Sequence, residues 1–394
     1  MNPVSTENLK RLRIDHIGSL VRPGKLKEAF ARYDRGQLDK EEFRRAQDEA
    51  VRDVIAGQEA HGLPVVTDGE FRRHSFQESF SEAVSGFDVP QDIGAYYEQR
   101  QLNRNPLERA EQNFDEQGPA IITRRPAVER LQLLRNIPLE EFRFAQRVAT
   151  KPVKVTLIGP DRVAPRFKWG ASKGVYKDLD DFVADVVAIE REMIEELVHA
   201  GCRYIQIDAP GYTAYVDQVS LDRMRSRGED PARNLQRSID ADNALMKTFP
   251  DVTFGIHICR GNARTIDPQT GKLVPQWHRE GHYDAIAERL FNGLKHHRLL
   301  LEYDSERAGS FEPLKFVPKD KVVVLGLVTT KSSELESIDN LKRRIDQATS
   351  YIPLDRLAIS PQCGFGGIDS KVMSEDEMWR KFDGILETAV QVWG

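Results

Sequence analysis

Short apolar runs recur along the chain, each ending in a small or polar residue. There are eight of them, at residues 14–17, 63–66, 153–158, 204–207, 253–258, 299–303, 322–328 and 357–359. They are rich in Val, Ile and Leu and do not alternate strictly with polar residues. That composition is typical of parallel strands buried on both faces. The pattern therefore predicts eight strands of one parallel sheet.

Most of these runs are followed by a pattern with helical periodicity. Helices are predicted over residues 179–200, 234–247, 283–294, 333–349 and 374–392. The first of these ends before Gly201, a residue that commonly stops helices. Eight strands that alternate with helices favour a single (β/α)8 TIM-type barrel. An open, doubly wound sheet is the alternative.

The segment from about residue 76 to residue 150 departs from this rhythm. It is long, polar and rich in Arg, Glu, Gln and Asn. It follows the second predicted strand, so we expect an insertion over one end of the barrel. A segment of this length without strong periodicity is usually functional or disordered. No internal repeat accompanies it, and we expect one elaborated domain over residues 1–394.

Composition and charge narrow the class of protein. The chain of 394 residues has 57 Lys plus Arg against 62 Asp plus Glu, a formal charge of −5, and 40% hydrophobic residues. This balance is typical of a soluble globular protein and argues against a nucleic-acid partner. No apolar run approaches the roughly 20 residues of a membrane helix. We therefore expect no membrane partner and leave a homo-oligomer open.

The three cysteines, Cys202, Cys259 and Cys363, are too few for a disulfide framework. Together with the lack of a visible secretory signal, this predicts a reduced, cytoplasmic setting. Cys202 directly precedes the fourth predicted strand, so we expect a buried structural residue at the N-terminal end of the barrel. The other two cysteines follow predicted strands.

Polar or turn-forming residues, many with reactive side chains, stand at the end of nearly every predicted strand. In strand order they are Asp15, His16, Gly18 and Ser19; Thr67, Asp68, Gly69 and Glu70; Gly159 and Pro160; Asp208; His257 and Cys259; Glu302 and Asp304; Thr329, Thr330 and Lys331; and Gln362 and Cys363. Barrel enzymes place their active sites at the C-terminal ends of the strands. The arrangement therefore indicates a catalytic mouth.

His257 and Cys259 carry the strongest local signal. Residues two apart on a strand face the same side, so both could reach one ion. Glu302 and Cys363 lie at the matching ends of other strands. A set of His, Cys, Glu and Cys suits tetrahedral zinc, which also activates an incoming thiol. A buried core His and Cys is the alternative for the His-x-Cys pair alone.

Seven segments together resemble the catalytic barrel of cobalamin-independent methionine synthase. They are HIGSLVRP (16–23), TDGEFRR (67–73), YIQIDAP (204–210), HICRGN (257–262), LEYDSERAG (301–309), GLVTTK (326–331) and SPQCGFGG (360–367). The similarity is greatest to the short, single-barrel members of that family. It implies a zinc-dependent transferase that moves a methyl group from a 5-methyltetrahydrofolate-type donor to the thiol of homocysteine, giving methionine.

The resemblance also implies roles for individual residues. The zinc ligands would be His257, Cys259, Glu302 and Cys363, with Asp304 as the alternative to Glu302. Ile17, Gly18 and Ser19 would bind the amino acid carboxylate through backbone amides and a hydroxyl, and Glu70 and Asp208 would bind its ammonium group. The arginines of the 76–150 segment could bind a polyglutamate tail on the donor. Because acidic residues are interleaved with them, the default interpretation is a solvent-exposed charged face. Those arginines are Arg100, Arg104, Arg109, Arg124, Arg125, Arg130 and Arg135.

Two departures from the family pattern keep other functions open. The family's Asp-Glu-Pro after the fourth strand is Asp208-Ala209-Pro210 here. A histidine of the long enzymes, which is thought to protonate the departing folate nitrogen, is replaced within Thr329-Thr330-Lys331. Such an amine leaves poorly unless it is protonated. We consider His16 and Asp68 as substitute acids.

The alternative enzyme is a zinc-dependent alkyltransferase of the same family that uses another thiol or alkyl donor, for example an epoxide and coenzyme M. A third hypothesis is a zinc-storing or thiol-binding protein without catalysis. A closed structural zinc site needs no ammonium-binding carboxylates nearby, and this argues against the third hypothesis.

Overall fold

The computed structural model describes residues 6–74, 76, 78–88, 126–167, 169–262, 264–266, 273–275, 279–366 and 372–394. Its strands are β1 (Val84–Phe87), β2 (Ala127–Leu133), β3 (Lys154–Ile158), β4 (Tyr204–Asp208), β5 (Thr253–Ile258), β6 (Arg264–Ile266), β7 (Leu273–Pro275), β8 (Arg298–Glu302), β9 (Val322–Val328) and β10 (Leu357–Pro361). Its α-helices are α1 (Thr6–Lys10), α2 (Gly24–Asp34), α3 (Lys40–Ala60), α4 (Glu78–Ala83), α7 (Ile137–Val148), α8 (Pro160–Val163), α9 (Trp169–Ser172), α10 (Leu179–His199), α11 (Gln218–Ser226), α12 (Pro231–Leu245), α13 (Ala287–Gly293), α14 (Ile338–Thr349) and α15 (Glu375–Trp393).

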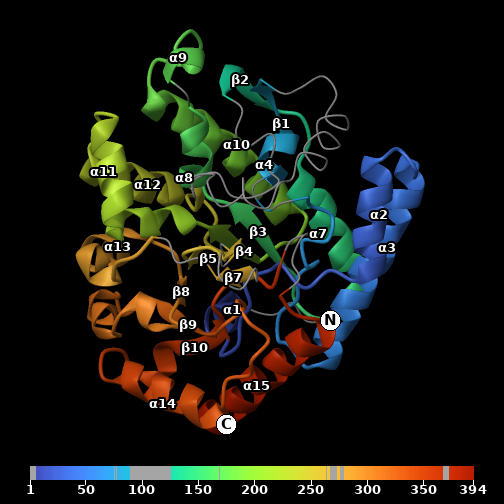
Figure 1. Cartoon of the computed structure of the whole chain (residues 1–394), viewed down its shortest axis with the longest axis vertical. Coiled ribbons are helices and arrows are strands. Elements are labelled where there is room, and N and C mark those ends of the chain that lie inside the picture. The colour runs from blue at the N-terminus through green and yellow to red at the C-terminus, as the bar shows by residue number, and fades with distance from the viewer. Residues whose placement is uncertain are drawn as a thin grey trace.

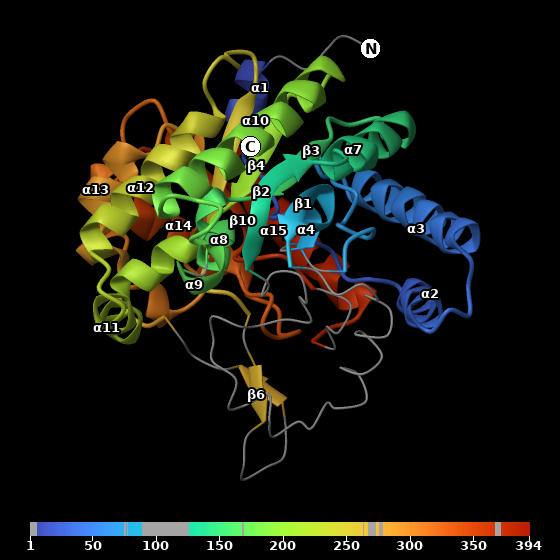
Figure 2. The same ribbon diagram turned by 90° about the horizontal axis from the view of Figure 1, so that it is seen from above.

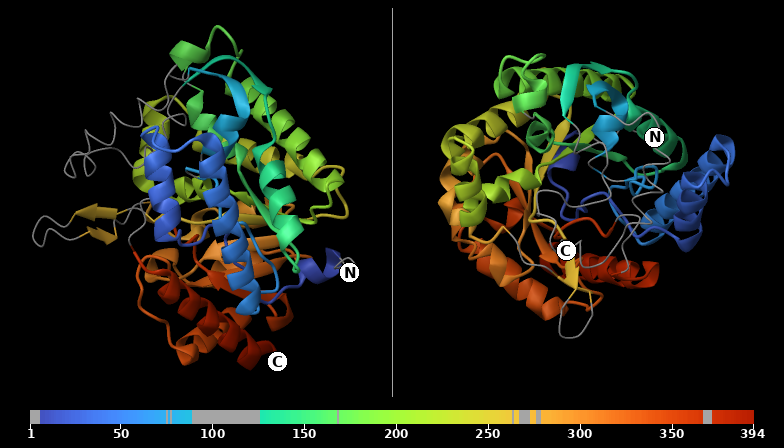
Figure 3. Two further views of the ribbon diagram at one scale, coloured as in Figure 1. Left: turned by 90° about the vertical axis from the view of Figure 1, so that its right-hand side faces the viewer. Right: turned by 45° about the horizontal axis from the view of Figure 1, so that its top comes forward.

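Six of the predicted strands form one parallel sheet in the order β10-β9-β8-β5-β4-β3. Every residue of these six strands is buried. That burial explains the near-continuous apolar runs in the sequence, because both faces of each strand are covered. Helices surround the strands on all sides (Figures 1 and 3).

The two remaining apolar runs lie at the edges of this sheet. Ile14 forms a parallel bridge with Ile359 of β10, and Val66 forms one with Val153, just before β3. Each run makes a single bridge, so the full strands predicted at residues 14–17 and 63–66 are wrong. Pro64 has no N–H to give to a ladder, which helps to explain the short second pairing.

Hydrogen bonds join the chain segments that follow these two runs. The Leu20 N–H donates to the Gly69 carbonyl (3.2 Å), and the Thr67 hydroxyl donates to the Gly18 carbonyl (2.7 Å). The two edges of the sheet are thereby connected. The single (β/α)8 TIM-type barrel predicted from the sequence is confirmed.

The helix boundaries follow from local capping. The Asp178 side chain accepts from the N–H of Asp181 at the start of α10, and Gly201 follows the helix with φ 101°. An N-terminal cap of this kind stabilises a helix by about 1 kcal/mol. Ser337 caps α14 in the same way, so that helix begins at Ile338 and not at residue 333 as predicted.

The segment between residues 76 and 150 contributes both secondary and irregular structure. Strands β1 and β2 pair antiparallel, and α7 packs on β3, α3 and α10 as a barrel helix does. A large part of the predicted insertion, residues 89–125, lies outside the described residues. The single-domain organisation with an insertion over one end stays a prediction.

One further feature lies on the outside of the barrel. β6 and β7 form an antiparallel hairpin after β5, and it projects from the body of the molecule (Figure 2). Within the described part of the chain, no helix is both long and apolar enough to cross a membrane.

Charged side chains fill the end of the barrel where the strands begin. The Asp15 carboxylate accepts hydrogen bonds from Lys154 Nζ (2.8 Å), Arg298 Nε (3.0 Å) and the Tyr204 hydroxyl (2.5 Å). The side chains of Asp15, Lys154 and Arg298 are fully buried. Burial opposes ionisation of Asp15, but the two cations outweigh it and lower the pKa of that carboxyl. These residues form a closed ionic cluster opposite the strand ends that carry the candidate site.

Two buried carboxyl groups lie between α10 and α12. Glu190 is buried, and neither of its carboxyl oxygens has a hydrogen-bond partner among the described residues. Asp242 is fully buried and accepts from the Tyr212 hydroxyl (2.5 Å). Burial raises the pKa of Asp242 to about 8, and burial together with the charge of Asp242 raises the pKa of Glu190 well above its usual range.

This burial makes stability depend on pH. Because the folded pKa of Asp242 exceeds its unfolded value near 4, its contribution to stability falls as pH rises from about 4 through about 8. We expect Asp242→Asn to gain stability relative to wild type between pH 6 and pH 8, by about 1–3 kcal/mol, in urea unfolding. Asp240→Asn, at an exposed position of the same helix, serves as the control. A difference that stays constant with pH would show that Asp242 is ionised in the folded protein.

Candidate active site

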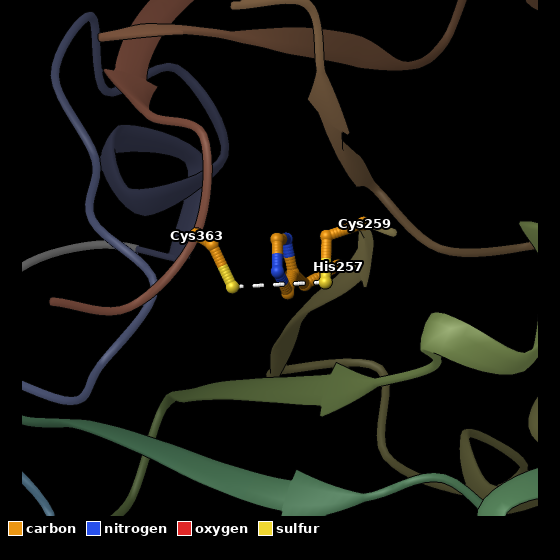
Figure 4. A group of neighbouring side chains, drawn as sticks. All are labelled: His257, Cys259 and Cys363. Atoms are coloured by element: carbon orange, nitrogen blue, oxygen red, sulfur yellow. Dashed lines mark hydrogen bonds between the residues drawn. The ribbon is translucent and has the colours of Figure 1, made fainter. Parts of the chain in front are cut away.

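Three side chains at the C-terminal end of the barrel converge on one point. His257 lies near the end of β5, Cys259 follows that strand, and Cys363 follows β10. Their ligand atoms all lie within 4.8 Å of one another, and the two Sγ atoms are 3.6 Å apart. Figure 4 shows the two sulfurs pointing toward each other beside the imidazole. The sequence prediction that these three residues share one site therefore agrees with their placement.

The chemistry of this group fits a soft metal ion. Both ring nitrogens of His257 are buried and lack a hydrogen-bond partner within the described chain. Buried polar atoms of native proteins normally have a partner, and a metal ion would provide one. Two sulfurs and one imidazole are the donors that zinc binds in tetrahedral sites.

The group also favours an ionised sulfur. The Cys363 thiol donates a hydrogen bond to the Cys259 sulfur, and this contact, helped by His257, holds the pKa of Cys259 well below its usual range. The same contact and burial raise the pKa of Cys363. Burial lowers the pKa of His257, but the charge of Cys259 outweighs that effect and raises it overall.

The fourth predicted ligand, Glu302, is not part of this group. Its Oε1 accepts from Arg307 Nη2 (2.6 Å) and Lys331 Nζ (3.2 Å), and its Oε2 accepts from the backbone N–H of Arg260 (2.7 Å). The alternative ligand, Asp304, accepts from the same Lys331 ammonium (2.8 Å). Burial opposes ionisation of Glu302, but Lys331 and Arg307 lower its pKa overall.

Of the two carboxylates predicted to bind an ammonium group, Asp208 lies beside the group of His257, Cys259 and Cys363, and Glu70 lies near Asp208. Asp208 ends β4 and is the register partner of His257 on β5. Burial raises the pKa of Asp208 to about 7, with His257 opposing this rise and Glu70 adding to it. Glu70 is buried and accepts from the Thr156 hydroxyl (2.8 Å).

The turn formed by Ile17, Gly18 and Ser19 runs between these groups. A Cβ on Gly18, whose φ is 134°, would lie 2.6 Å from Thr156 Cγ2 and 3.3 Å from Glu70 Oε1. On the other side, a Cβ on Gly364 would collide with the Ser19 hydroxyl oxygen. The turn therefore lies close to both the carboxylate Glu70 and Gly364, the residue next to Cys363.

The proposed acid Asp68 shapes the backbone beside this turn. Its Oδ1 accepts from the N–H of Glu70 (2.9 Å), which adopts a left-handed conformation with φ 58°. Such a conformation is uncommon for a residue other than glycine and needs support from its surroundings. Asp68 thus holds Glu70 in position.

The other proposed acid, His16, is not brought to the strand ends. Its ring packs edge-on against Phe382 of α15, and its Nε2 lies 3.2 Å from the Val65 carbonyl oxygen. Burial lowers the pKa of His16 to about 3. This placement does not agree with the prediction of His16 as a proton donor at the strand ends.

Gln206 is a part of the site that our sequence interpretation missed. Its amide nitrogen donates to the Ile17 carbonyl (2.6 Å) and to Asp208 Oδ1 (2.7 Å), while its oxygen accepts from Lys154 (2.9 Å). It therefore links the turn to the carboxylate. Gln206 and Asp208 are two residues apart on one strand, and this spacing already places them on the same face.

The arginines considered for a polyglutamate tail are only partly described. Arg130 pairs with Asp181 and Asp185 on α10, and Arg135 pairs with Glu140. The other five lie outside the described residues.

Comparison with known proteins identifies the family. Residues 14–266 and 299–375 match the family model described as "Cobalamin-independent synthase, Catalytic domain". The chain is 32% identical over 387 residues to YxjH, an uncharacterised Bacillus subtilis protein, with 97% of this chain and 94% of that protein covered. It is 24% identical over 358 residues to a methionine synthase of Sulfurisphaera tokodaii, covering 90% of this chain and 86% of that protein.

Solved structures share the fold. A Listeria monocytogenes protein, solved as a candidate vitamin-B12-independent methionine synthase, superposes with a TM-score of 0.71 at 24% identity, covering 97% of this chain and 98% of that one. A B12-independent methionine synthase from Shewanella sp. W3-18-1, in complex with selenomethionine, gives a TM-score of 0.67 at 19% identity, with 97% of each chain covered. Because the family model matches most of the chain and a relative at 32% identity covers 97% of it, the chain belongs to the cobalamin-independent methionine synthase family, and this membership makes it a methyltransferase.

Proposed function

We propose that the protein is a zinc-dependent methyltransferase that transfers a methyl group from a 5-methyltetrahydrofolate-type donor to homocysteine, forming methionine. One observation carries the proposal most directly: the group of His257, Cys259 and Cys363 lies beside the buried carboxylate Asp208, and a second buried carboxylate, Glu70, lies near Asp208. A bound zinc ion lowers the pKa of a coordinated thiol, so that the thiol is an anionic nucleophile at neutral pH.

The protein's own residues bind and orient the acceptor in this proposal. Glu70 and Asp208 hold the ammonium group, because buried carboxylates gain most from a cationic partner. The Ile17–Ser19 turn meets the carboxylate of the same amino acid. The thiolate sulfur then forms a bond to the methyl carbon as the bond from that carbon to the protonated donor nitrogen breaks, so that the donor leaves as a neutral amine. Holding both reactants in line supplies much of the rate enhancement.

Loss of charge at the ammonium site gives a prediction specific to substrate binding. We expect Glu70→Gln and Asp208→Asn each to raise the KM for homocysteine by about 10–100-fold, since one charged hydrogen bond contributes about 1.5–3 kcal/mol. Zinc content, measured by elemental analysis, should remain at the wild-type value. Loss of zinc from either variant would contradict the assignment of these carboxylates to the amino acid.

A second candidate keeps the metal and the thiol but changes the partners. Thr329-Thr330-Lys331 stands where the long enzymes have a histidine, and Ala209 replaces a family glutamate. These differences favour testing a zinc-dependent alkyltransferase that uses another thiol or donor, such as an epoxide and coenzyme M. Methionine production from homocysteine with mono- and triglutamyl 5-methyltetrahydrofolate tests the first candidate. Turnover only with another thiol or alkyl donor would favour the second.

A further inference from the structure

The Arg73 guanidinium lies between two buried carboxylates and pairs closely with only one of them. Its Nε and Nη2 donate to the carboxylate of Glu141, on α7, at 3.1 Å and 2.7 Å. Its closest approach to Glu70 is 3.6 Å, between Nη1 and Oε1, which is too long for a hydrogen bond. All three side chains are at most 7% exposed. Within the described part of the chain, no other carboxylate is in ion-pair distance of Arg73.

The Thr156 hydroxyl of β3 stands between the guanidinium and Glu70. It accepts from Arg73 Nη1 (3.0 Å) and donates to Glu70 Oε1 (2.8 Å). The Thr156 carbonyl accepts a further hydrogen bond from Arg73 Nη2 (3.0 Å). Among the described residues, no donor contacts Oε2 of Glu70. Glu70 is therefore held in place by a neutral hydroxyl and keeps one oxygen for a ligand.

The charges in this group show the same preference as the distances. Burial lowers the pKa of Arg73, but Glu141 and, after it, Glu70 outweigh burial and raise that pKa overall. Two carboxylates thus compete for one cation, and Glu141 has the charge-assisted hydrogen bonds, which are the stronger kind. A buried carboxylate without a close cation gains most from a new cationic partner. In this group that carboxylate is Glu70.

We propose that Glu141 is a positioning residue for acceptor recognition: it holds Arg73 away from Glu70 and so keeps the Glu70 carboxylate available to the ammonium group of the acceptor amino acid. This inference rests on the proposed function, which assigns Glu70 to that ammonium group. Arg73 lies three residues after Glu70 in the same turn and would neutralise it if Glu141 were uncharged. Glu141 acts through Arg73 and needs no contact with the substrate.

The test measures binding of homocysteine to the zinc-loaded, full-length protein by isothermal titration calorimetry. We expect Glu141→Gln to raise the Kd by about tenfold, because Arg73 then moves onto Glu70 and competes with the ammonium group. The analogue of homocysteine that lacks the amino group should bind wild type and Glu141→Gln with the same affinity. Burial raises the pKa of Glu141 to about 7, so the titrations are run at about pH 8, where wild type is ionised at this position.

Glu140→Gln is the matched control for this substitution. Glu140 is the neighbouring residue of α7, its side chain is 53% exposed, and it pairs with Arg135. The control should leave the affinity for both ligands unchanged. Circular dichroism establishes that each variant is folded.

The double variant Arg73→Met/Glu141→Gln separates this role from a purely structural one. It removes the cation that Glu141 restrains and leaves neither member of the pair as a buried, unpaired charge. The Kd for homocysteine should return to within about threefold of wild type, since nothing then competes for Glu70. A Kd that stays weak in the double variant would overturn the inference. So would a wild-type Kd in Glu141→Gln, or an equal weakening of the analogue.

These outcomes are distinguishable from failure of the proposed function. If wild type binds homocysteine no better than the analogue, the protein does not recognise the ammonium group, and the assignment of Glu70 fails together with the inference. If wild type prefers homocysteine and Glu141→Gln keeps that preference in full, only the role of Glu141 is wrong.

Discussion

Replacing Cys259 with serine is expected to remove zinc from the protein and to lower methyl transfer by at least about 1,000-fold, or about 4 kcal/mol in the activation barrier. The reason is that a serine hydroxyl does not replace the low-pKa sulfur that lies 3.6 Å from Cys363 Sγ. Without the metal, the acceptor thiol is mostly protonated at neutral pH and is no longer held in place. Zinc content and the initial rate of methionine formation measure the two effects.

Cys202 provides the matched control for this substitution. It is fully buried, and its Sγ contacts the Tyr204 carbonyl oxygen (3.5 Å) where β4 begins, so the structural role predicted from the sequence is confirmed. Cys202→Ser should retain zinc and the wild-type rate per folded molecule. If Cys259→Ser kept both zinc and activity, the metal-binding group would have no role in the reaction.

The second large effect concerns stability. Asp15→Asn is expected to lower the free energy of unfolding by about 3–5 kcal/mol, because it leaves the buried Lys154 and Arg298 without their shared counterion. The substitution preserves the size of the side chain, so the loss reports charge and not packing. Urea unfolding followed by circular dichroism measures it.

An exposed ion pair gives the comparison for this prediction. Asp222 pairs with Arg225 at 2.9 Å, and the two side chains are 62% and 56% exposed. Asp222→Asn should change the unfolding free energy by less than about 1 kcal/mol, as is usual for surface pairs. Equal effects of Asp15→Asn and Asp222→Asn would show that the cluster does not support the barrel.

The sequence pattern predicted the fold well where burial determines it. The runs that became β3 to β5 and β8 to β10 are apolar because both faces of each strand are covered. The first two runs could not be distinguished from full strands by composition. Their single bridges depend on partners that are distant in the sequence, Ile359 and Val153.

The sequence predicted the placement of the site residues less reliably than it predicted the fold. His257 and Cys259 were placed together because strand geometry puts residues two apart on one face. Glu302 satisfies the same strand-end rule, yet its oxygens are engaged by Arg307, Lys331 and the Arg260 N–H. His16 also lies near the end of an apolar run, but its ring packs against Phe382 of α15. The position of a residue along a strand does not show which neighbouring groups will hydrogen-bond to its side chain or pack against it.

The central claim is that this site binds zinc and presents it to the thiol of homocysteine. Zinc X-ray absorption on the metal-loaded protein, with and without homocysteine, tests this most directly. We expect two sulfur ligands at about 2.3 Å without homocysteine and three with it. An unchanged two-sulfur zinc after saturation with homocysteine, or no zinc bound to sulfur at all, would contradict the account.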